Sequence, residues 1–375
     1  MINVLELIDG GFIGGGQLQT LSLCRNLDIH NFKPIVCASP NGDFKNLVIE
    51  SGYSFRDLVL PKIYRSKYLK ELNNIIQSEE IDLIHAHGGV AGMYARFYKR
   101  RYNNNVKVLH TLHGIHYIHS KNIIRRKLSL YIEQYLADYA DAYICETQSD
   151  YKTACELRII NPSKTEVIYN GISLNKFAPG NMDDSIANEF NITAKDFVIG
   201  NISRFDEQKN QKLLVRIFPA LLKQIPEVKL LLVGDGYLLD SVRNLAIKLN
   251  VFDKVIFAGS RSDLFNIYPL IDIFVFPSLW EGLSLTLLEA LASGKSIIAG
   301  KIPSNQEILN DGVDGLLFDL NNETELEEKI KFLYLNKEKR QLLSENALKL
   351  SRKFDEKHMA EKTEQLYLKL INNSK

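Results

Sequence analysis

The chain has 375 residues, and at about 150 residues per domain this length predicts two domains of ordinary size. Hydrophobic residues make up 45% and charged residues 24%, which excludes a disordered chain, a collagen-like repeat and a disulfide scaffold. The 46 Lys and Arg residues against 45 Asp and Glu residues leave a formal charge of +1, too balanced for a non-specific nucleic-acid binder. We therefore expect no nucleic-acid partner.

Cysteine usage and the N-terminal sequence bear on the compartment. The cysteines lie far apart and form no C-x-x-C pair, so neither a zinc ribbon nor a disulfide framework is indicated; they are Cys24, Cys37, Cys145 and Cys155. The N-terminal run INVLELIDGG has no basic region before it and reads as a strand, not as a signal peptide. No stretch of about 18 apolar residues occurs, so we expect no membrane span. A cytoplasmic location follows as an expectation.

Short β-branched runs alternate with amphipathic stretches in the first half, a pattern typical of βαβ units that build parallel sheets. The strands expected there are Ile2–Ile8, Pro34–Ala38, Leu83–His85, Val106–Leu112, Ala142–Cys145 and Glu166–Tyr169. Gln17–Leu27 is a predicted helix with Leu18, Leu21 and Leu27 on one side. The Pro-, Gly- and Asp-rich segment Lys176–Ser185 is the predicted linker.

The second half repeats this pattern. Its expected strands are Phe197–Ile202, Val228–Val233, Val255–Ala258, Ile271–Phe276, Ser296–Ala299 and Gly315–Phe318. The stretch Arg352–Ile371 is predicted to be a terminal helix with apolar residues Phe354, Met359, Leu366, Leu368 and Leu370. We therefore expect an α/β protein with two doubly wound parallel sheets that face one another.

The sharpest motif is WEGLSLTLLEALASGKSIIAG, in which Glu281 and Glu289 are separated by seven residues just after a strand. A strand that leads through a Gly-containing turn into a helix places backbone N–H groups at the C-terminal edge of a sheet, where α/β proteins bind ligands. Two carboxylates in this position can accept paired hydrogen bonds from the hydroxyls of a ribose or a pyranose. A capped helix with surface glutamates is the alternative interpretation.

Two further turns in the second half carry candidate residues. In ISRFDEQKN, Arg204 and Lys209 follow a strand and precede a helix, an arrangement suited to a diphosphate. In LLLVGDGYLLD, Gly234 and Gly236 allow a tight turn, but Leu239 stands where a dinucleotide fingerprint has its third glycine. Solvated surface cations are the alternative interpretation of the first turn.

In the first half, GFIGGGQLQT places Gly14, Gly15 and Gly16 immediately before a helix, where backbone N–H groups can face an anion. His113 followed by Gly114 ends a predicted strand, so its imidazole can reach a ligand at the sheet edge. The other clustered histidines invite a metal interpretation, which we do not favour because neither H-E-x-x-H nor clustered cysteine is present; they are His85, His87, His110, His116 and His119.

Together these motifs resemble the retaining glycosyltransferases of family 4, which have the GT-B fold. The resemblance covers nearly the whole chain: the Gly-rich turn, His113-Gly114, YNGIS at Tyr169–Ser173, SRFDEQKN, VGDG and PSLWEGLSLTLLEA. It implies an N-terminal acceptor-side Rossmann-like domain over residues 1–178, a nucleotide-sugar domain over 179–351, and a C-terminal helix over 352–375 that crosses back to the first domain. One departure is Gln17, which stands where the family often has an acid.

The resemblance also implies roles for individual residues. Arg204 and Lys209 would neutralise the donor diphosphate, Glu281 and His113 would contact the donor sugar, and these four form the predicted catalytic set. Glu289 would bind the ribose hydroxyls. The other residues expected to contact the donor are Gly15, Gly16, Gly234, Gly236, Ser260, Arg261, Gly282, Leu283, Ser284 and Leu285.

Fixed cations at the departing diphosphate can replace a metal ion, so we expect neither a metal nor another cofactor. The expected reaction is transfer, with retention, of a sugar from a nucleotide donor, a UDP-sugar being the expected one, to a lipid-linked or glycan acceptor in cell-surface polysaccharide or oligosaccharide synthesis. Two alternatives stay open: a nucleotide-sugar epimerase of the same fold, and a non-catalytic nucleotide-sugar-binding protein.

The charge is unevenly divided along the chain. Residues 1–178 have 21 Lys and Arg against 17 Asp and Glu, a balance of +4, and residues 179–375 have 25 against 28, a balance of −3. Three acid-free basic segments with aromatic neighbours lie in the first part, at Lys62–Lys70, Arg96–Lys107 and Lys121–Lys127. They predict peripheral association with an anionic cytoplasmic membrane face, ordinary solvated surface being the alternative.

Overall fold

The computed structural model describes residues 1–102 and 105–372, so Asn103 and Asn104 of the second basic segment lie outside the described residues. The chain forms two compact units: unit 1 comprises Met1–Ile172 and the C-terminal segment from Glu356, and unit 2 comprises Ser173–Asp355. The boundary between the two units falls after Ile172 and so precedes the expected boundary at residue 178. Phe177 already belongs to unit 2, because its ring packs edge-on against the Tyr268 ring.

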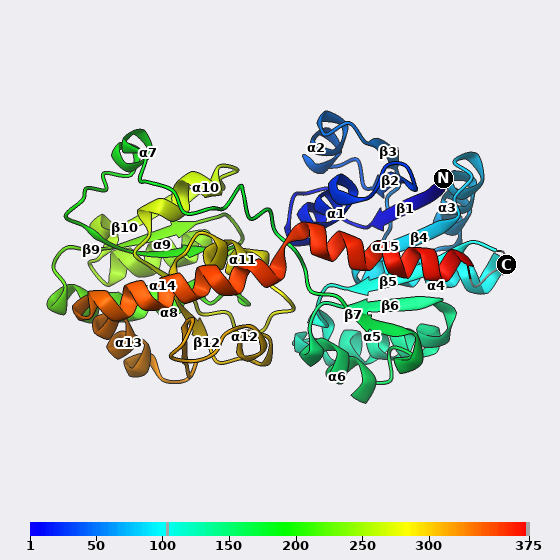
Figure 1. The fold of residues 1–375 in the computed structure, drawn as a ribbon. Coiled ribbons are helices and arrows are strands. Elements are labelled where there is room, and N and C mark those ends of the chain that lie inside the picture. The colour runs from blue at the N-terminus through cyan, green and yellow to red at the C-terminus, as the bar shows by residue number, and fades with distance from the viewer. Residues whose placement is uncertain (103–104, 373–375) are drawn as a thin grey trace. The chain divides into compact units, whose positions relative to one another are not determined.

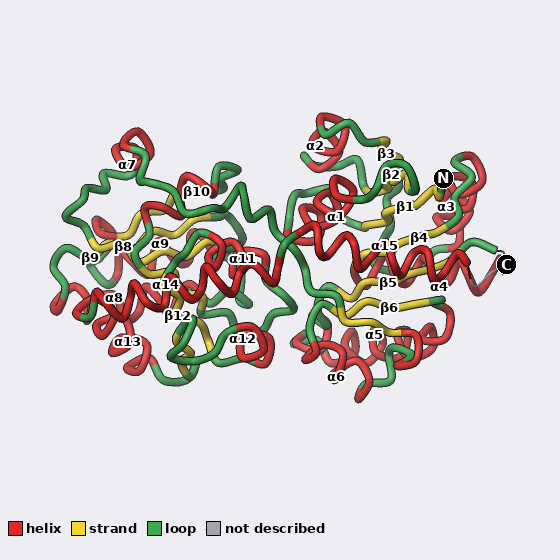
Figure 2. The backbone as a smooth tube through the Cα atoms, in the orientation of Figure 1, coloured by secondary structure: helices red, strands yellow, loops and turns green. Residues whose placement is uncertain are grey.

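Unit 1 is built on a parallel sheet whose seven described strands have the order β3-β2-β1-β4-β5-β6-β7 (Figures 1 and 2). The strands are β1 Ile2–Ile8, β2 Phe32–Ala38, β3 Ser54–Asp57, β4 Leu83–His87, β5 Lys107–Leu112, β6 Ala142–Cys145 and β7 Thr165–Val167. The sequence did not predict β3, because this edge strand is four residues long and contains Arg56 and Asp57. The other six expected strands are present, with ends that differ by a few residues.

The helices of unit 1 are α1 Gly15–Asn26, α2 Phe44–Glu50, α3 Ser66–Ser78, α4 Gly88–Tyr102, α5 Ile123–Leu136, α6 Gln148–Glu156 and α15 Glu356–Asn372. In α1, Leu21 is buried and Leu27, which follows the helix, is buried as well. Leu18 is 40% exposed, so the prediction that it shares their buried side is wrong. It lies in the first turn of the helix.

Unit 2 has a second parallel sheet, with the described strands in the order β10-β9-β8-β11-β12-β13. They are β8 Phe197–Ile202, β9 Val228–Val233, β10 Val255–Gly259, β11 Ile273–Phe276, β12 Ser296–Gly300 and β13 Leu316–Phe318, in close agreement with the predicted strands. The helices are α7 Asp184–Glu189, α8 Gln211–Gln224, α9 Leu239–Lys248, α10 Leu264–Ile267, α11 Leu285–Ala292, α12 Pro303–Ile308, α13 Glu323–Leu335 and α14 Lys337–Ser351.

The C-terminal segment differs from the single helix predicted. A 3₁₀ turn covers Arg352–Phe354, Asp355 is extended, and α15 begins at Glu356. Figure 1 shows α15 lying over the sheet of unit 1 beside α1, and Met359, Leu366 and Tyr367 are buried there. Leu368, one of the apolar residues of the predicted helix, is 38% exposed because it falls outside the helix face that carries those three residues.

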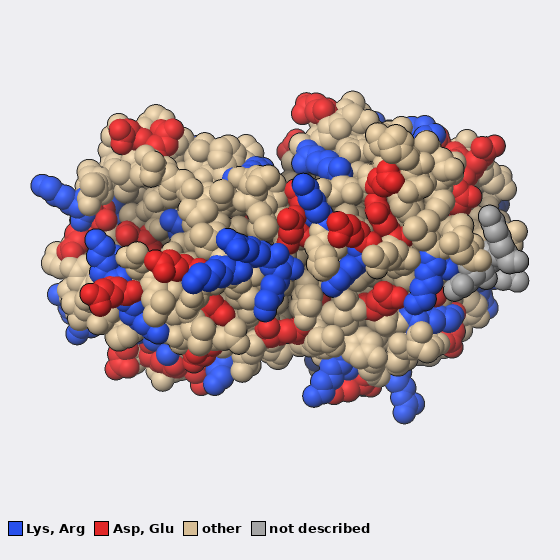
Figure 3. Space-filling view, in the orientation of Figure 1, with Lys and Arg blue, Asp and Glu red and all other residues tan. Residues whose placement is uncertain are grey.

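Both sheets have a topological switch point, where strand order reverses: between β1 and β4 in unit 1 and between β8 and β11 in unit 2. Loops at the C-terminal ends of such strand pairs form the usual ligand sites of open α/β sheets. Within the described ranges no helix has both the length and the apolar character needed to cross a membrane. On the face seen in Figure 3, Lys and Arg are interspersed with Asp and Glu over both units, in keeping with the small net charge.

Candidate active site

An ion pair joins the two main sequence motifs of unit 2. Lys209 precedes α8 and Glu281 precedes α11, and the Lys209 Nζ lies 2.5 Å from Glu281 Oε1. Their side chains are only 15% and 6% exposed. Gln208 donates from Nε2 to the other carboxylate oxygen of Glu281 over 3.1 Å. The structure therefore brings together two of the four predicted catalytic residues, at the switch point between β8 and β11.

Arg204 belongs to the same loop but is held differently. Its Nε donates to Asp206 Oδ2 over 2.7 Å, while the Arg204 side chain remains 69% exposed. The other Asp206 oxygen accepts a hydrogen bond from the Lys209 backbone N–H over 3.1 Å. Asp206 thus shapes the loop that carries both cations, and the Arg204 guanidinium retains donors that face solvent.

Gly234 and Gly236 support this loop from behind. Their φ angles are 135° and 151°, and a Cβ added to them would lie 2.1 Å from the Ser203 carbonyl oxygen and 2.4 Å from that of Phe205. The two glycines therefore let their own loop pack closely against the backbone on either side of Arg204. Glycine is required there because side chains rarely adopt this backbone conformation and no room is left for a Cβ.

Glu289 lies in the second turn of α11 and is buried. Tyr268 donates its hydroxyl to Glu289 Oε2 over 3.1 Å and to the Thr286 carbonyl over 3.0 Å. Burial raises the pKa of Glu289 to about 7, while the Tyr268 hydrogen bond and the charge of Lys176 act in the opposite direction. A buried carboxylate in the helix that follows a sheet edge suits the hydroxyls of a ligand.

The remaining predicted contacts of unit 2 are spread along its sheet edge. Gly282 and Leu283 are buried, and Leu285 begins α11. Ser284 is the N-cap residue of α11, but its side chain does not cap the backbone of the first turn. The Ser284 hydroxyl instead lies 2.9 Å from Thr286 Oγ1. Ser260 is exposed after β10. Arg261 donates to both oxygens of Asp263 and to Glu189, which raises its pKa, so a ligand there would compete with two carboxylates.

The predicted residues of unit 1 meet at its own switch point. Gly15 and Gly16 begin α1, and a Cβ on Gly16 would lie 3.9 Å from His113 Nε2. His113 follows β5 and its side chain is 17% exposed. Its Nδ1 lies 2.5 Å from Glu146 Oε1, just after β6, and its Nε2 lies 3.2 Å from His87 Nδ1. His113 is thus adjacent to the N-terminus of α1, and both of its nitrogens have partners.

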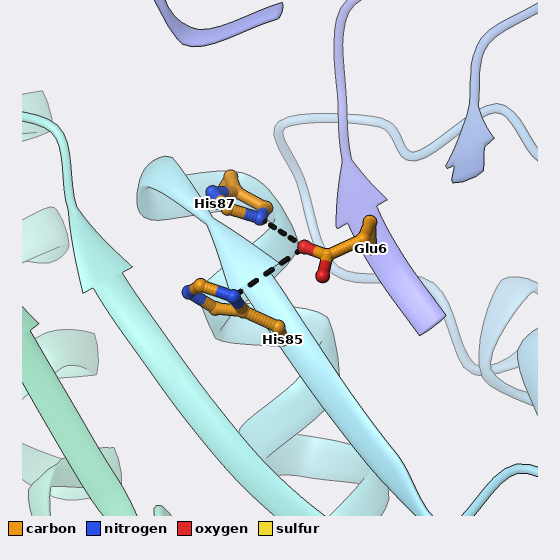
Figure 4. Close-up of side chains that lie close together, drawn as sticks. All are labelled: Glu6, His85 and His87. Carbon is orange, nitrogen blue, oxygen red and sulfur yellow. Dashed lines mark hydrogen bonds and ion pairs between the residues drawn. The ribbon is translucent and has the colours of Figure 1, made fainter. Parts of the chain in front are cut away.

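Behind His87 lies a fully buried polar cluster. Figure 4 shows Glu6 of β1 facing His85 and His87 of β4, with Glu6 Oε2 2.6 Å from His87 Nε2 and 3.4 Å from His85 Nδ1. Donor atoms of these three residues lie within 4.8 Å of one another, which is close enough for a metal ion. Each donor atom, however, already has a hydrogen-bond partner, so the cluster needs no ion to be satisfied.

One of the three basic segments, Arg96–Lys107, is only partly exposed. Arg96 is fully buried and its Nη2 lies 2.7 Å from Glu133 Oε2, while Lys99 pairs with Asp141 at 3.2 Å. The prediction that Arg96–Lys107 faces a membrane is therefore wrong for Arg96 and Lys99. The segment itself contains no acid, but the fold brings acids from other segments, Glu133 and Asp141, to these two cations. Lys62–Lys70 and Lys121–Lys127 are largely exposed.

Several site residues were not identified from the sequence. Asp206 and Gln208 lie inside the SRFDEQKN motif, so the motif itself held the signal. Glu146 directly follows a strand end, the same signal that identified His113. Tyr268 lies 21 residues before Glu289 in an unremarkable turn, and no local pattern connects them.

Comparisons with known proteins identify the family of the chain. The family model for glycosyltransferase family 4 matches residues 13–176, and the model for group 1 glycosyl transferases matches residues 182–350. The chain is 27% identical over 301 residues to a putative glycosyltransferase, EpsD, of Bacillus subtilis, which covers 80% of this chain and 79% of that protein. It is 29% identical over 260 residues to the UDP-Gal:alpha-D-GlcNAc-diphosphoundecaprenol alpha-1,3-galactosyltransferase of Escherichia coli, covering 68% and 67%.

Among solved structures, Alr3699/HepE of Anabaena in complex with UDP-glucose superimposes with a TM-score of 0.85 at 20% identity, covering 98% of this chain and all of that one (100%). At this identity the likeness concerns the fold. It confirms the predicted fold, two Rossmann-like parallel-sheet domains of the GT-B type.

Proposed function

The chain belongs to glycosyltransferase family 4, and from this membership we propose that it transfers a sugar, with retention, from a UDP-sugar to a lipid-linked glycan acceptor during cell-surface polysaccharide or oligosaccharide synthesis. The single observation that carries the proposal is the Lys209–Glu281 pair beside the exposed Arg204 at the switch point of unit 2. The donor is supported by the E. coli relative, named for UDP-Gal, and by the UDP-glucose complex of the Anabaena protein. The diphosphoundecaprenol in the relative's name supports the acceptor.

The chemistry proposed for unit 2 follows from its charges. Breaking the bond between sugar and phosphate leaves negative charge on the departing diphosphate, and Lys209 and Arg204 are cations fixed on one loop. Lys209 would exchange Glu281 for the diphosphate, which frees the Glu281 carboxylate to accept hydrogen bonds from donor-sugar hydroxyls. Glu289 would take the ribose hydroxyls.

We propose that this chemistry needs no metal ion, because two cations held on one loop can neutralise the departing diphosphate. The test is transfer after exhaustive treatment with EDTA and dialysis. Unchanged turnover is expected, and turnover that is lost with EDTA and restored by Mg²⁺ or Mn²⁺ would contradict the proposal.

The reaction itself is tested with a panel of UDP-, GDP- and ADP-sugars, each offered with and without an undecaprenyl diphosphate-linked acceptor. The expected result is a lipid-linked product, detected by mass spectrometry, only when a UDP-sugar and the acceptor are both present. An isomerised nucleotide sugar without acceptor would instead indicate an epimerase. Saturable donor binding without any product would indicate a binding protein.

We propose in addition that unit 1 docks on the cytoplasmic face of an anionic membrane. An exposed apolar stripe runs along α5 with the helical spacing 4, 3 and 4; it consists of Ile124, Leu128, Tyr131 and Tyr135. Exposed cations from Lys121–Lys127 flank its start, and those of Lys62–Lys70 lie at the start of α3. Both helices begin at the C-terminal edge of the sheet, so the basic groups and the start of the apolar stripe lie at the same edge as His113.

Flotation with liposomes at low salt tests this docking. The double variant Ile124→Ser, Leu128→Ser should lose most binding to vesicles that contain anionic lipid. The matched control is Leu335→Ser, Leu342→Ser, which removes two exposed leucines of unit 2 and should leave binding unchanged. Equal loss in both variants, or binding that is independent of anionic lipid, would count against the proposal.

A further inference from the structure

His113 ends a chain of hydrogen bonds that crosses the sheet edge of unit 1. Glu146 Oε1 lies 2.5 Å from His113 Nδ1, His113 Nε2 lies 3.2 Å from His87 Nδ1, and His87 Nε2 lies 2.6 Å from Glu6 Oε2. The four residues come from or follow four strands, β6, β5, β4 and β1. His113, with a side chain 17% exposed, is the most accessible of them.

The buried end of the chain is fixed by the C-terminal helix. Tyr367 of α15 donates its hydroxyl to Glu6 Oε1 over 2.9 Å, and the same hydroxyl oxygen lies 2.6 Å from His85 Nδ1. His85 Nε2 in turn lies 2.7 Å from the Thr111 hydroxyl. If His85 donates from Nδ1 to Tyr367 and accepts from Thr111 at Nε2, every group is satisfied with a neutral ring. Burial lowers the pKa of His85 well below its usual value, which agrees with that neutral form.

The hydrogen bonds of the chain can be counted in protons. Three hydrogen bonds in series, from Glu146 to Glu6, need three protons. Two neutral imidazoles carry one ring N–H each and so supply two. The chain therefore holds one proton more than two neutral rings and two carboxylates provide. Without this proton, one of the three contacts would join two acceptor atoms that have no hydrogen between them.

The surroundings decide where this additional proton resides. Tyr367 donates to Glu6 Oε1, which favours the carboxylate form of Glu6, and this carboxylate then accepts from His87 Nε2–H. Burial lowers the pKa of His87, against the effect of Glu6, so His87 keeps one proton and offers a lone pair at Nδ1. The additional proton then lies in the 2.5 Å contact between His113 Nδ1 and Glu146 Oε1, where a proton on His113 would have its positive charge balanced by the Glu146 carboxylate.

We propose that Glu146 and His87 are positioning residues that hold His113 as an imidazolium, Nδ1–H toward Glu146 and Nε2–H toward His87, and that Glu6 and Tyr367 fix His87 from behind. In this state His113 has no free lone pair. It can act on a ligand as a hydrogen-bond donor, by directing Nε2–H to a hydroxyl oxygen in place of His87, and it cannot act as a general base. This inference rests on the proposed function only for its effect on turnover.

Nuclear magnetic resonance of the protein labelled with ¹⁵N-histidine tests the protonation state without any substrate. The chain has 8 histidines, and the His113 signals are assigned as those that disappear in His113→Asn. The expected pattern at neutral pH is a ring with both nitrogens protonated. A neutral His113 ring, with an unprotonated nitrogen facing either Glu146 or His87, would overturn the proposal.

Two variants test the positioning residues. Glu146→Gln keeps an acceptor for Nδ1–H but removes the balancing charge, so His113 should lose its additional proton while Nδ1–H is retained. Turnover should fall by about tenfold or more, since an altered protonation state in such a pair has large effects on rate. Glu146→Gln with the wild-type His113 pattern and wild-type turnover would overturn the proposal.

Tyr367→Phe tests the buried end of the chain. It should shift the signals of His85, His87 and His113. Tyr143→Phe is the matched control: Tyr143 is also fully buried, and its hydroxyl donates to the Ala137 carbonyl over 2.7 Å, outside the chain. The control should leave the His113 pattern unchanged, and equal shifts in both variants would contradict the proposed coupling. If no donor is turned over while the His113 pattern is as expected, the proposed function fails and the positioning role stands.

Discussion

The two sheet edges that carry the candidate residues are built in opposite ways. In unit 2, Lys209, Arg204 and Glu281 come from two loops, their charges are balanced by neighbours within reach, and Arg204 is largely exposed. In unit 1, His113 is tied to groups from four other elements, and those behind it are buried. We expect the first edge to exchange its internal partners for those of a ligand, whereas the second edge ties both nitrogens of one imidazole to neighbouring side chains.

The largest expected effect is at the Lys209–Glu281 pair. Lys209→Ala and Glu281→Ala should each reduce turnover by about 10²- to 10³-fold, as for loss of one contact to developing charge. Each substitution should also lower the midpoint of thermal unfolding. The other member of the Lys209–Glu281 pair would remain mostly buried without its counter-charge, which is destabilising. The combined variant Lys209→Met, Glu281→Leu should regain stability but not turnover.

Lys229 provides the matched control for this comparison. It pairs with Asp196 at 3.1 Å, with side chains 15% and 12% exposed, close to the exposures of Lys209 and Glu281. Lys229→Ala should cost similar stability and leave the turnover of the folded protein unchanged. A variant at Lys209 with near-normal turnover, or an equal loss of turnover at Lys229, would remove the mechanism proposed for unit 2.

The same contrast explains what the sequence could predict. The motifs of unit 2 are contiguous, so Arg204, Lys209, Glu281 and Glu289 could be identified from local pattern and from the strand ends that precede them. His113 could be identified in the same way. Its partners could not, because Glu6 and Tyr367 are 361 residues apart and meet only through the packing of α15 on the sheet.

A second prediction concerns the loop that carries Arg204. Gly234→Ala should destabilise the protein by about 3–4 kcal/mol, because the added Cβ would meet a backbone carbonyl 2.1 Å away at a φ of 135°. Gly259→Ala is the control: its φ is 69°, but a Cβ there meets nothing within 4 Å, so only the conformational cost of about 1 kcal/mol applies. Thermal unfolding measures both, and similar losses would mean that contact with Ser203 is not what requires Gly234.

A third prediction uses the pH dependence of stability. Burial raises the folded-state pKa of Glu289 from 4.5 to about 7, so its contribution to stability is fully present below pH 4.5 and is lost as the pH rises through about 7. At about 1.4 kcal/mol for each pKa unit, the loss is at most about 3 kcal/mol. Glu289→Gln should remove this dependence, so its unfolding midpoint should fall less than that of the wild type between pH 5 and pH 7.

The control for this measurement is Glu338→Gln, which neutralises an exposed glutamate of α14. It should keep the pH dependence of the wild type. If Glu289→Gln also keeps it, the carboxyl group of Glu289 is not the buried acid that the structure indicates.

The smallest effect on the fold, and the clearest difference between the two edges, is expected at Gly16. A Cβ on Gly16 would lie 3.5 Å from Ile8 Cδ1 and 3.8 Å from His113 Cδ2, which are ordinary contacts, and the residue is in α1, where alanine is favoured over glycine. Gly16→Ala should therefore leave the unfolding midpoint unchanged or slightly raised. Because the methyl group would occupy space beside His113, where the proposed function places the donor, turnover should nevertheless fall by about tenfold, a change of about 1.4 kcal/mol. Gly234→Ala would thus act by destabilising the fold, and Gly16→Ala by restricting access to His113. A Gly16→Ala protein with normal turnover would show that no ligand approaches α1 at this point.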